Sequence, residues 1–364
     1  MIKISKKLIS TIATVALSAT LSTNSIAQAD FAGKTVSLVV PGDEGSGGHR
    51  FGLLFAPFLE KYLPGEPTVL VVPRPGGSGA IAGSWFQRSA GNEGLNLIVS
   101  STSMITNAMF KPHAVHFDMS DWQPVLLSPL GTCVLVNKDT GATGIDPIAD
   151  ASALQNEKQR YGAKTATSSD IRALLALDML GLLDNTQVIF GQESGAAMQG
   201  LARGEFTINV SNTSSCLKSV AQFDNIDILM SFGYFDNNGT LQRDPSLPNN
   251  YTILEAYKAN NNGADPSGEN WNMMKHFINI AVMASKGIFL HPDTPQDIRD
   301  TYNEAVAKML TDPEFISRAK KEIGDYPIAT GNDAKRIIDG ALQIHPSSMD
   351  WMRTWMTKEF EVKF

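Results

Sequence analysis

Two glycine-rich turns constrain the fold of this chain more than any other feature of its sequence. Residues 45–48 (Gly-Ser-Gly-Gly) follow the apolar run Thr35 to Val40, and residues 75–79 (Pro-Gly-Gly-Ser-Gly) follow the apolar run Thr68 to Val72. After the first turn, apolar residues recur at helical spacing between positions 49 and 62. Short apolar strands that alternate with amphipathic helices are typical of parallel sheets covered on both faces. The sequence therefore predicts an α/β fold with a mostly parallel sheet.

The two turns also predict a site for an anion. Each turn lies at the expected N-terminus of a helix, where free backbone N–H groups and the positive end of the helix dipole favour negative charge. In a parallel sheet both turns lie at the carboxyl edge, where ligands bind. We therefore expect a carboxylate or a phosphate held from two sides, although the glycines could instead serve only to allow tight turns.

The alternation of strands and helices continues along the chain and indicates two lobes. Leu95 to Val99 is a third strand. The strand-like run Pro124 to Asn137 is too long for one simple element, and we expect it to leave the first lobe and enter the second near Gly131. A further strand is expected at Phe277 to Ala284, where the chain returns. Thr294 then begins an amphipathic helix of the first lobe.

These boundaries predict how the chain is divided. Lobe 1 is expected to comprise residues 30–130 and 285–364, and lobe 2 residues 131–284. The stretch around residues 233–270 is rich in Asn, Gly, Asp and Pro, which predicts a surface insertion within the second lobe.

The first 29 residues predict a cleaved signal peptide. Lys3, Lys6 and Lys7 form a positive start, Leu8 to Leu21 is an apolar stretch, and residues 27–29 (Ala-Gln-Ala) match the small-x-small cleavage pattern. The apolar stretch is short for a bilayer span and is interrupted by Ser and Thr. No cysteine lies near the predicted cut, so lipid attachment is not expected. We therefore expect a soluble protein of the periplasm.

Charge and cysteine content narrow the class of partner. The predicted signal peptide holds three lysines and no acid, so its removal takes the net charge from −7 to about −10. An acidic chain argues against nucleic acid as a partner, although a local field can still draw an anion into a cleft. Cys133 and Cys216 fit no zinc pattern. They could form a disulfide in an oxidising compartment or remain two buried thiols.

The sequence motifs that mark a bound cofactor or a catalytic nucleophile are only partly matched in this chain. The second turn misses the spacing of the dinucleotide fingerprint by one residue, and no Gly-Lys-Ser/Thr follows for a phosphate-binding loop. Ser78 precedes Gly79 and Ala80, whereas a nucleophile elbow requires glycine at the second of these positions. His113 and His116 stand three residues apart beside Pro112, which predicts a surface loop and not a metal site. We therefore expect no catalytic residue, no metal and no cofactor.

Three motifs occur in the order and spacing of a known family. Residues 39–48 give a strand, a Val-Pro pair and a glycine-rich turn. Residues 72–83 are similar to an Asn-Arg-Pro-Gly-Ala-Gly-Gly-x-Ile-Gly loop. Residues 161–169 align with a Tyr-x-Ser-x-Gly-x-Gly-Ser turn, although Lys164 and two threonines stand where glycines are usual. In these features, and through nearly the whole chain after the predicted cut, the sequence resembles the Bug receptor family, the periplasmic solute receptors of tripartite tricarboxylate transporters.

The resemblance implies a type II periplasmic-binding-protein fold, a Venus flytrap whose two lobes close on a ligand. It implies that the first two turns hold one carboxylate through backbone N–H groups, and that the second lobe contacts the far end. Amino-acid-binding members typically carry Asp directly after the first turn, where this chain has His49, so a ligand without an ammonium group is expected. The ligand-binding residues that it implies are Ser46, Gly47, Gly48, His49, Gly76, Gly77, Ser78, Gly79, Thr102, Ser103, Thr167, Ser168 and Asn212.

The function that the resemblance implies is binding of a small carboxylate, either a di- or tricarboxylate or an aromatic acid. The ligand would then pass to the membrane subunits of a tripartite transporter, and a monomer is expected. Two alternatives remain. An exported α/β enzyme acting on an organic acid would need a reactive Ser, Cys or His with a base partner in the cleft. A sensor protein would present the same ligand to a membrane kinase.

Overall fold

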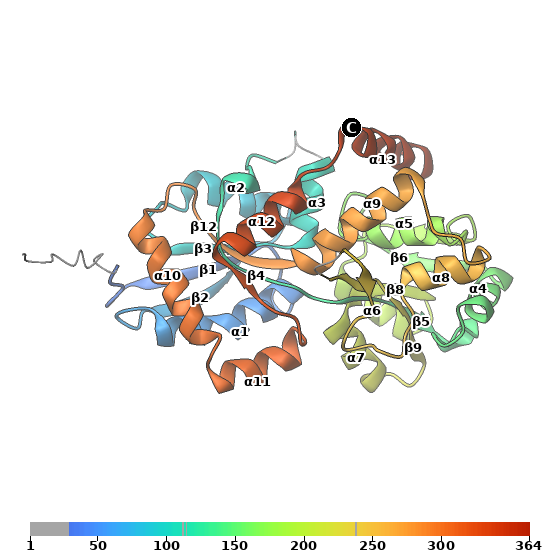
Figure 1. The fold of residues 1–364 in the computed structure, drawn as a ribbon, viewed down its shortest axis with the longest axis horizontal. Helices are drawn as coiled ribbons and strands as arrows, with labels where there is room; N and C mark the ends of the chain where they lie inside the picture. Colours follow the sequence, from blue (N-terminus) through green and yellow to red (C-terminus); the bar gives the residue numbers. More distant parts are fainter. Residues whose placement is uncertain (1–28, 111–112, 114, 237–238) are drawn as a thin grey trace, which may run out of the picture.

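The computed structural model describes residues 29–364 except 111–112, 114 and 237–238. The predicted signal peptide, residues 1–29, lies outside the described residues apart from Ala29. The described chain contains two large sheets that lie side by side, each with its own helices (Figure 1). The predicted α/β class with two lobes is thereby confirmed.

The first sheet contains the strands β1 (Thr35–Val40), β2 (Thr68–Pro73), β3 (Asn96–Val99), β4 (Gln123–Ser128), β12 (Lys286–Leu290) and β13 (Ala329–Thr330). They lie in the order β13-β4-β12-β3-β1-β2. β1 pairs in parallel with β2 and β3. β12 runs antiparallel to β3 and β4, and β13 antiparallel to β4. The other strands therefore point the same way, so the carboxyl ends of β1, β2 and β3 meet at one edge.

Helices pack around this sheet. They are α1 (Gly47–Tyr62), α2 (Ala80–Ser89), α3 (Thr102–Phe110), α10 (Gln296–Met309), α11 (Pro313–Glu322) and α12 (Gly331–Leu342). α1 packs against α10 and α11, and its contact with α11 is made by buried aromatic rings. The ring of Phe315 lies 5.3 Å from that of Phe55 and 5.2 Å from that of Phe58, centroid to centroid. This core holds α1, the helix that follows the first glycine turn, against the other helices of the first sheet.

The second sheet has five strands: β5 (Thr132–Asn137), β6 (Gln159–Gly162), β7 (Thr186–Ile189), β8 (Ile208–Asn212) and β9 (Ile226–Ser231). They lie in the order β7-β6-β8-β5-β9, with β5 antiparallel to both neighbours and β6 parallel to β7 and β8. Its helices are α4 (Pro147–Asn156), α5 (Ile171–Met179), α6 (Ser194–Ala202), α7 (Thr213–Gln222), α8 (Ile253–Asn260) and α9 (Gly268–Ile278). A mostly parallel sheet in each lobe is confirmed.

The chain crosses from the first sheet to the second within the long run Pro124 to Asn137. That run forms β4 in one sheet and β5 in the other, with Gly131 in the link between them. A Cβ atom at Gly131 would collide with the side chains of Thr213, Asp244 and Tyr326. Glycine is therefore required at this crossing because three side chains pack directly against its backbone.

The strand expected at Phe277 to Ala284 is wrong. The end of α9 and a π-helical turn (Asn279–Met283) occupy this segment, and β12 begins only at Lys286. Phe277, Ile280 and Val282 are all buried and only Asn279 of the segment is exposed, and a short, mostly apolar run has no clear period that separates helix from strand. The chain nevertheless returns to the first sheet directly afterwards, as β12.

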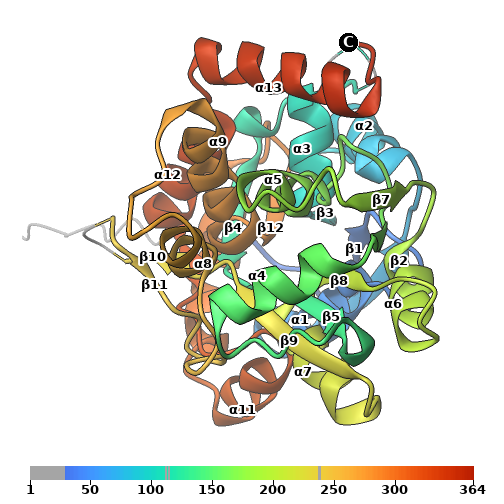
Figure 2. The same ribbon diagram turned by 90° about the vertical axis from the view of Figure 1, so that its right-hand side faces the viewer.

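The C-terminal segment departs from the expected lobe boundary. α10, α11 and α12 lie with the first sheet, whereas α13 (Pro346–Phe360) packs against α9. The ring of Phe360 also lies 5.9 Å from that of Phe190, next to β7. Figure 2 shows α13 running across the top of the molecule. We therefore propose that lobe 1 comprises residues 30–130 and 285–342, and that α13 belongs with residues 131–284.

The stretch expected as a surface insertion, residues 233–270, is partly built into the core. It contains the short hairpin of β10 (Tyr234–Phe235) and β11 (Leu241–Gln242), followed by α8. α8 packs on α4, and its Ile253 is fully buried. The hydroxyl of Tyr251 donates to Asp150 Oδ2 at 2.9 Å. This stretch therefore closes one side of the second lobe.

Cys133 in β5 and Cys216 in α7 form a disulfide. Both residues are fully buried and lie 83 positions apart in the sequence. The bond joins a strand of the second sheet to the helix that covers it. Of the two alternatives that the sequence left open, the structure has the disulfide.

Loss of this disulfide is expected to destabilise the protein. A cross-link that closes a loop of this length restricts the unfolded chain, which is worth about 4 kcal/mol in the chain-entropy account. We predict that the double variant Cys133→Ala/Cys216→Ala loses about 2–4 kcal/mol of unfolding free energy, measured by urea denaturation. Reductant during unfolding should lower the stability of the wild type similarly and leave the variant unchanged. A wild type insensitive to reductant would contradict the assignment.

Candidate functional site

A cleft of about 480 Å³ lies between the two halves of the molecule. Residues at the N-termini of α1 and α3 line it from the side of the first sheet, and residues at the N-termini of α5, α6 and α7 line it from the other side. The positive ends of five helix dipoles therefore meet at one cleft. Such ends, with their free backbone N–H groups, favour a bound anion.

The structure brings together more than half of the residues predicted for the ligand site. Those that line the cleft are Ser46, Gly47, Gly48, Ser78, Thr102, Ser103 and Asn212. The other predicted residues, His49, Gly76, Gly77, Gly79, Thr167 and Ser168, are not among its lining residues in the described part of the chain. Their positions explain why.

The first glycine turn faces the cleft as predicted. Ser46 caps α1, and its Oγ accepts a hydrogen bond from the backbone N–H of His49 at 3.2 Å. A Cβ atom added at Gly47 would lie 3.8 Å from Nδ2 of Asn212, which belongs to the other half of the molecule. The missing side chain of Gly47 therefore keeps the space between the two halves open.

His49 holds the first turn in shape and does not line the cleft. The backbone N–H of Gly45 donates to His49 Nδ1 at 3.2 Å. Arg50 supports the same turn, because its Nη1 donates to the carbonyl oxygen of Gly45 at 2.6 Å. A contact between His49 and a ligand stays a prediction, and the structure has the ring of His49 in contact with the backbone of the turn.

In the second glycine-rich turn, residues 75–79, Ser78 is the residue that lines the cleft. Gly76, Gly77 and Gly79 have φ values of +119°, +56° and +94°, in the region that favours glycine. The carbonyl oxygen of Gly77 accepts a hydrogen bond from Asn107 Nδ2 at 2.9 Å. These glycines therefore bend the loop that presents Ser78.

In the serine turn of the second lobe, Ser169 lines the cleft in place of Thr167 and Ser168. Ser168 is fully buried, and its Oγ donates to Asp170 Oδ2 at 2.8 Å. Ser169 faces the other half of the molecule, where its Oγ lies 3.0 Å from Oγ of Ser103. The resemblance implied Thr167 and Ser168, and it did not specify which residue of this turn the backbone would direct into the cleft.

Four cationic side chains of the cleft were not predicted: Arg50, Lys164, Arg172 and Lys286. Lys164 had been noted only as a departure from glycine. Arg172 lies on a helix whose other residues are mostly apolar, and Lys286 opens an apolar strand. Arg172 and Lys286 could have been found from the sequence, because each is a charged residue next to a run of apolar residues that are expected to be buried. A charged side chain is rarely buried unless a group of opposite charge pairs with it.

The surroundings of Lys286 disfavour its charged form. Burial, followed by the nearby positive charges of Arg172, Lys164 and Arg50, lowers the pKa of Lys286 to about 8. Its Nζ lies 3.5 Å from the carbonyl oxygen of Ser285, the nearest partner given by the structure. An anion in the cleft would reverse this destabilisation of the charged amine.

The two halves already touch at both sides of the cleft. Besides the contact between Ser103 and Ser169, Arg50 Nη2 donates to Ser215 Oγ at 3.3 Å. Lys218 on α7 forms an ion pair with Glu322 on α11, at 2.9 Å between Nζ and Oε2. These contacts describe an arrangement in which the halves are closed against each other.

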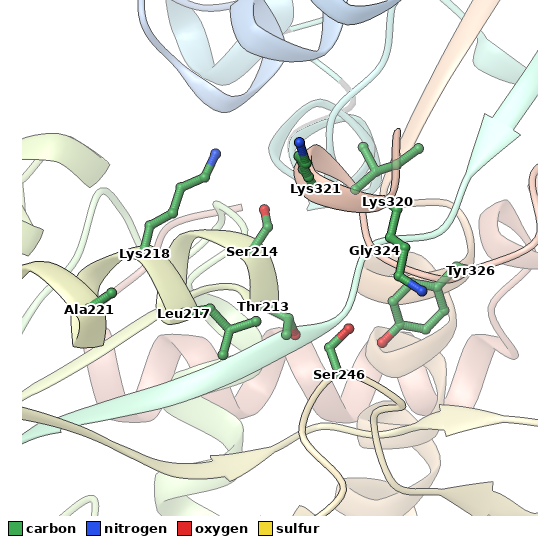
Figure 3. A pocket seen from close by; sticks show the side chains of 11 residues that line it. Thr213, Ser214, Leu217, Lys218, Ala221, Ser246, Lys320, Lys321, Gly324 and Tyr326 are labelled. Carbon is green, nitrogen blue, oxygen red and sulfur yellow. The ribbon is translucent and has the colours of Figure 1, made fainter. Parts of the chain in front are cut away.

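A smaller groove of about 260 Å³ lies between α7 and the end of α11. Figure 3 shows Lys218 on one side of it and Lys320 and Lys321 on the other. Lys218 is paired with Glu322, and Lys320 with Asp325 at 2.6 Å. Because two of its three cations are already neutralised, this groove is a weaker anion site than the cleft.

Within the part of the chain that the structure describes, no group of three or more His, Cys, Asp and Glu side chains is placed to hold a metal ion. None of the helices in these described residues has the length and apolar character needed to cross a membrane.

In sequence, the chain is similar to a protein of Pseudomonas over most of its length. No family model matches the chain. Over 331 residues it is 22% identical to a protein of Pseudomonas sp. (strain P51), described as a UPF0065 protein in the tcbD-tcbE intergenic region. The match covers 90% of this chain and 88% of that protein.

Several solved structures share the fold over nearly the whole chain. A Rhodopseudomonas palustris protein, Rpa4515, solved with adipate, has a TM-score of 0.67 at 17% identity, covering 91% of this chain and 98% of that one. MatC of the same organism, solved with bound malate, has a TM-score of 0.65 at 17% identity, covering 88% and 98%. The periplasmic binding protein BugD has a TM-score of 0.64 at 16% identity, covering 89% and 97%.

These likenesses agree with the order of elements described above. They extend through both sheets and the crossings between them, so they concern the whole two-lobed architecture and not one motif. The chain therefore has the fold of the periplasmic solute-binding proteins, and its predicted resemblance to the Bug receptors of tripartite tricarboxylate transporters is confirmed.

Proposed function

We propose that this chain is an exported periplasmic solute-binding protein that captures a small carboxylate between its two lobes. It then delivers the ligand to the membrane subunits of a tripartite tricarboxylate-type transporter, and it acts as a monomer. One observation carries the proposal: five helix N-termini and four cationic side chains line a single cleft between the lobes. A carboxylate is the common metabolite group that matches such a surface.

The energy available in the cleft is sufficient for a transport receptor. A hydrogen bond to a charged group contributes about 1.5–3 kcal/mol. A micromolar ligand requires about 8 kcal/mol. A few N–H and hydroxyl donors from each lobe therefore account for such an affinity, and the cations add to it.

The solved proteins of the same fold support a carboxylate as the ligand class. MatC was solved with malate and Rpa4515 with adipate, both of them dicarboxylates. The periplasmic location rests on the predicted signal peptide together with the likeness to BugD, described as a periplasmic binding protein.

The hydroxyl groups of the cleft are arranged for binding. Ser46 Oγ caps a helix, and Ser103 Oγ pairs with Ser169 Oγ. Thr102 lies at the start of α3. None of these pairings joins a hydroxyl to a histidine or a carboxylate that could activate it as a nucleophile. We therefore propose that the ligand leaves the cleft chemically unchanged.

Binding without conversion can be tested directly. We predict that the purified protein, screened by thermal shift against dicarboxylates, tricarboxylates, aromatic acids and amino acids, binds at least one carboxylate at one molecule per chain. Mass spectrometry after prolonged incubation should recover that ligand intact. Turnover of the ligand would favour the exported enzyme instead, and stabilisation by amino acids alone would exclude the proposed ligand class.

Closing the space in front of Gly47 should block binding. In Gly47→Val the branched side chain would enter the gap toward Asn212, where even a Cβ atom lies 3.8 Å from the amide nitrogen. Gly47 is not among the residues with positive φ, so valine is compatible with its backbone. We predict a loss of affinity of about 100-fold or more by titration calorimetry, corresponding to removal of at least one charge-assisted contact.

A matched change elsewhere controls for the cost of valine in a helix. Gly340 in α12 has no neighbour within 4 Å of an added Cβ atom and lies outside the cleft. Gly340→Val should therefore bind as the wild type does. If Gly47→Val also binds normally, the first turn does not contact the ligand.

A further inference from the structure

The cations of the cleft come from opposite halves of the molecule. Lys286 opens β12 and Arg50 lies in α1, both on the side of the first sheet. Arg172 lies in α5, and Lys164 follows β6, both on the side of the second. Like charges that face each other across a closed cleft repel, and the repulsion grows as water is excluded. The closed arrangement therefore needs a compensating negative charge.

The acids of the cleft compensate only part of this charge. Glu193 pairs with Lys164 at 2.6 Å. Asp170 is held by other donors, because Tyr161 Oη donates to its Oδ1 at 2.7 Å and the backbone N–H of Lys164 to its Oδ2 at 2.9 Å. Asp43 and Glu44 also line the cleft, but both are exposed to solvent.

Of the three cations that remain, Arg50 is exposed to solvent and donates to Gly45 and Ser215, which leaves Lys286 and Arg172 inside the cleft. Among the described residues, neither forms an ion pair with a carboxylate. Arg172 is 9% exposed, and its Nε has no hydrogen-bond partner although its Nη1 donates to the carbonyl oxygen of Ser169 at 2.6 Å. A buried guanidinium with an unused donor is costly unless something in the cleft pairs with it.

We propose that the ligand is a dianion, with one carboxylate at the glycine turn of α1 and a second held between Lys286 and Arg172. The inference rests on the proposed function and makes it narrower, because it selects dicarboxylates over aromatic monoacids and amino acids. The second carboxylate joins β12 of one half to α5 of the other. It therefore removes the repulsion between the halves and stabilises their closed arrangement.

The test compares ligands that differ only in the second charge. Glutarate and valerate have the same number of carbons, as do adipate and hexanoate, and titration calorimetry near neutral pH gives the affinity ratio within each pair. We expect the wild type to bind a dicarboxylate at least about 10-fold more tightly than its monocarboxylate partner. In Lys286→Met this ratio should fall by about 10- to 100-fold. Lys286→Arg, which keeps the charge, should restore most of it.

A second lysine provides the matched control. Lys321 lies in the outer groove and not in the cleft, so Lys321→Met makes the same chemical change at a distance from the ligand. Its affinity ratio should equal that of the wild type. If the wild type binds mono- and dicarboxylates equally, or if Lys286→Met keeps the full ratio, the dianion is refuted while the proposed function stands. If none of the carboxylates in the broader screen binds, the proposed function itself fails.

The titration of Lys286 gives an independent readout. Because its pKa in the free protein is about 8, the amine loses its charge as pH rises through that value. A bound dianion raises the pKa, so binding takes up protons and the affinity for a dicarboxylate falls between about pH 7 and pH 9. Lys286→Arg should bind equally well across this range, since arginine stays charged. Equal pH slopes in both proteins would contradict a direct contact with Lys286.

Discussion

The gathering of positive charge at one cleft is the constraint on which the rest of this structure depends. Five helix N-termini and four cationic side chains line the same space, and they are supplied by two separate sheets. Parallel strands make this possible, because they place successive helix starts at the same edge. The crossings between the sheets then bring the two edges together. One lobe alone would offer helix N-termini to an anion from one side. The two lobes closed together would surround the anion.

The disulfide and the close packing around Gly131 hold the wall of the cleft that the second lobe provides. The disulfide joins β5, which enters that lobe, to α7, whose N-terminus lines the cleft. At the crossing itself, Gly131 lets Thr213, Asp244 and Tyr326 approach the backbone closely. Thr213 is the first residue of α7, so the crossing and one wall of the cleft are held by the same contacts.

Much of this could be predicted from the sequence because it rests on local patterns. The apolar runs and glycine turns predicted the alternation of elements, the sheet type and the first turn of the site. The failures occurred where local pattern carries no information. Phe277 to Ala284 is mostly apolar and buried apart from Asn279 and Met283, so its sequence shows no clear helical period. Lys286 and Arg172 are far apart in the chain, and only the tertiary fold places both at the cleft. Which serine turns inward, Ser169 or Ser168, depends on backbone geometry that the resemblance did not specify.

The most direct test of this account is a crystal structure of the protein with a dicarboxylate that it binds in solution. The account predicts one carboxylate within hydrogen-bond distance of the backbone N–H groups of Gly47 and Gly48. The second carboxylate should lie within ion-pair distance of Lys286 and Arg172. A ligand found in the groove beside Lys218, or one in the cleft whose carboxylates contact neither the glycine turn nor these cations, would contradict it.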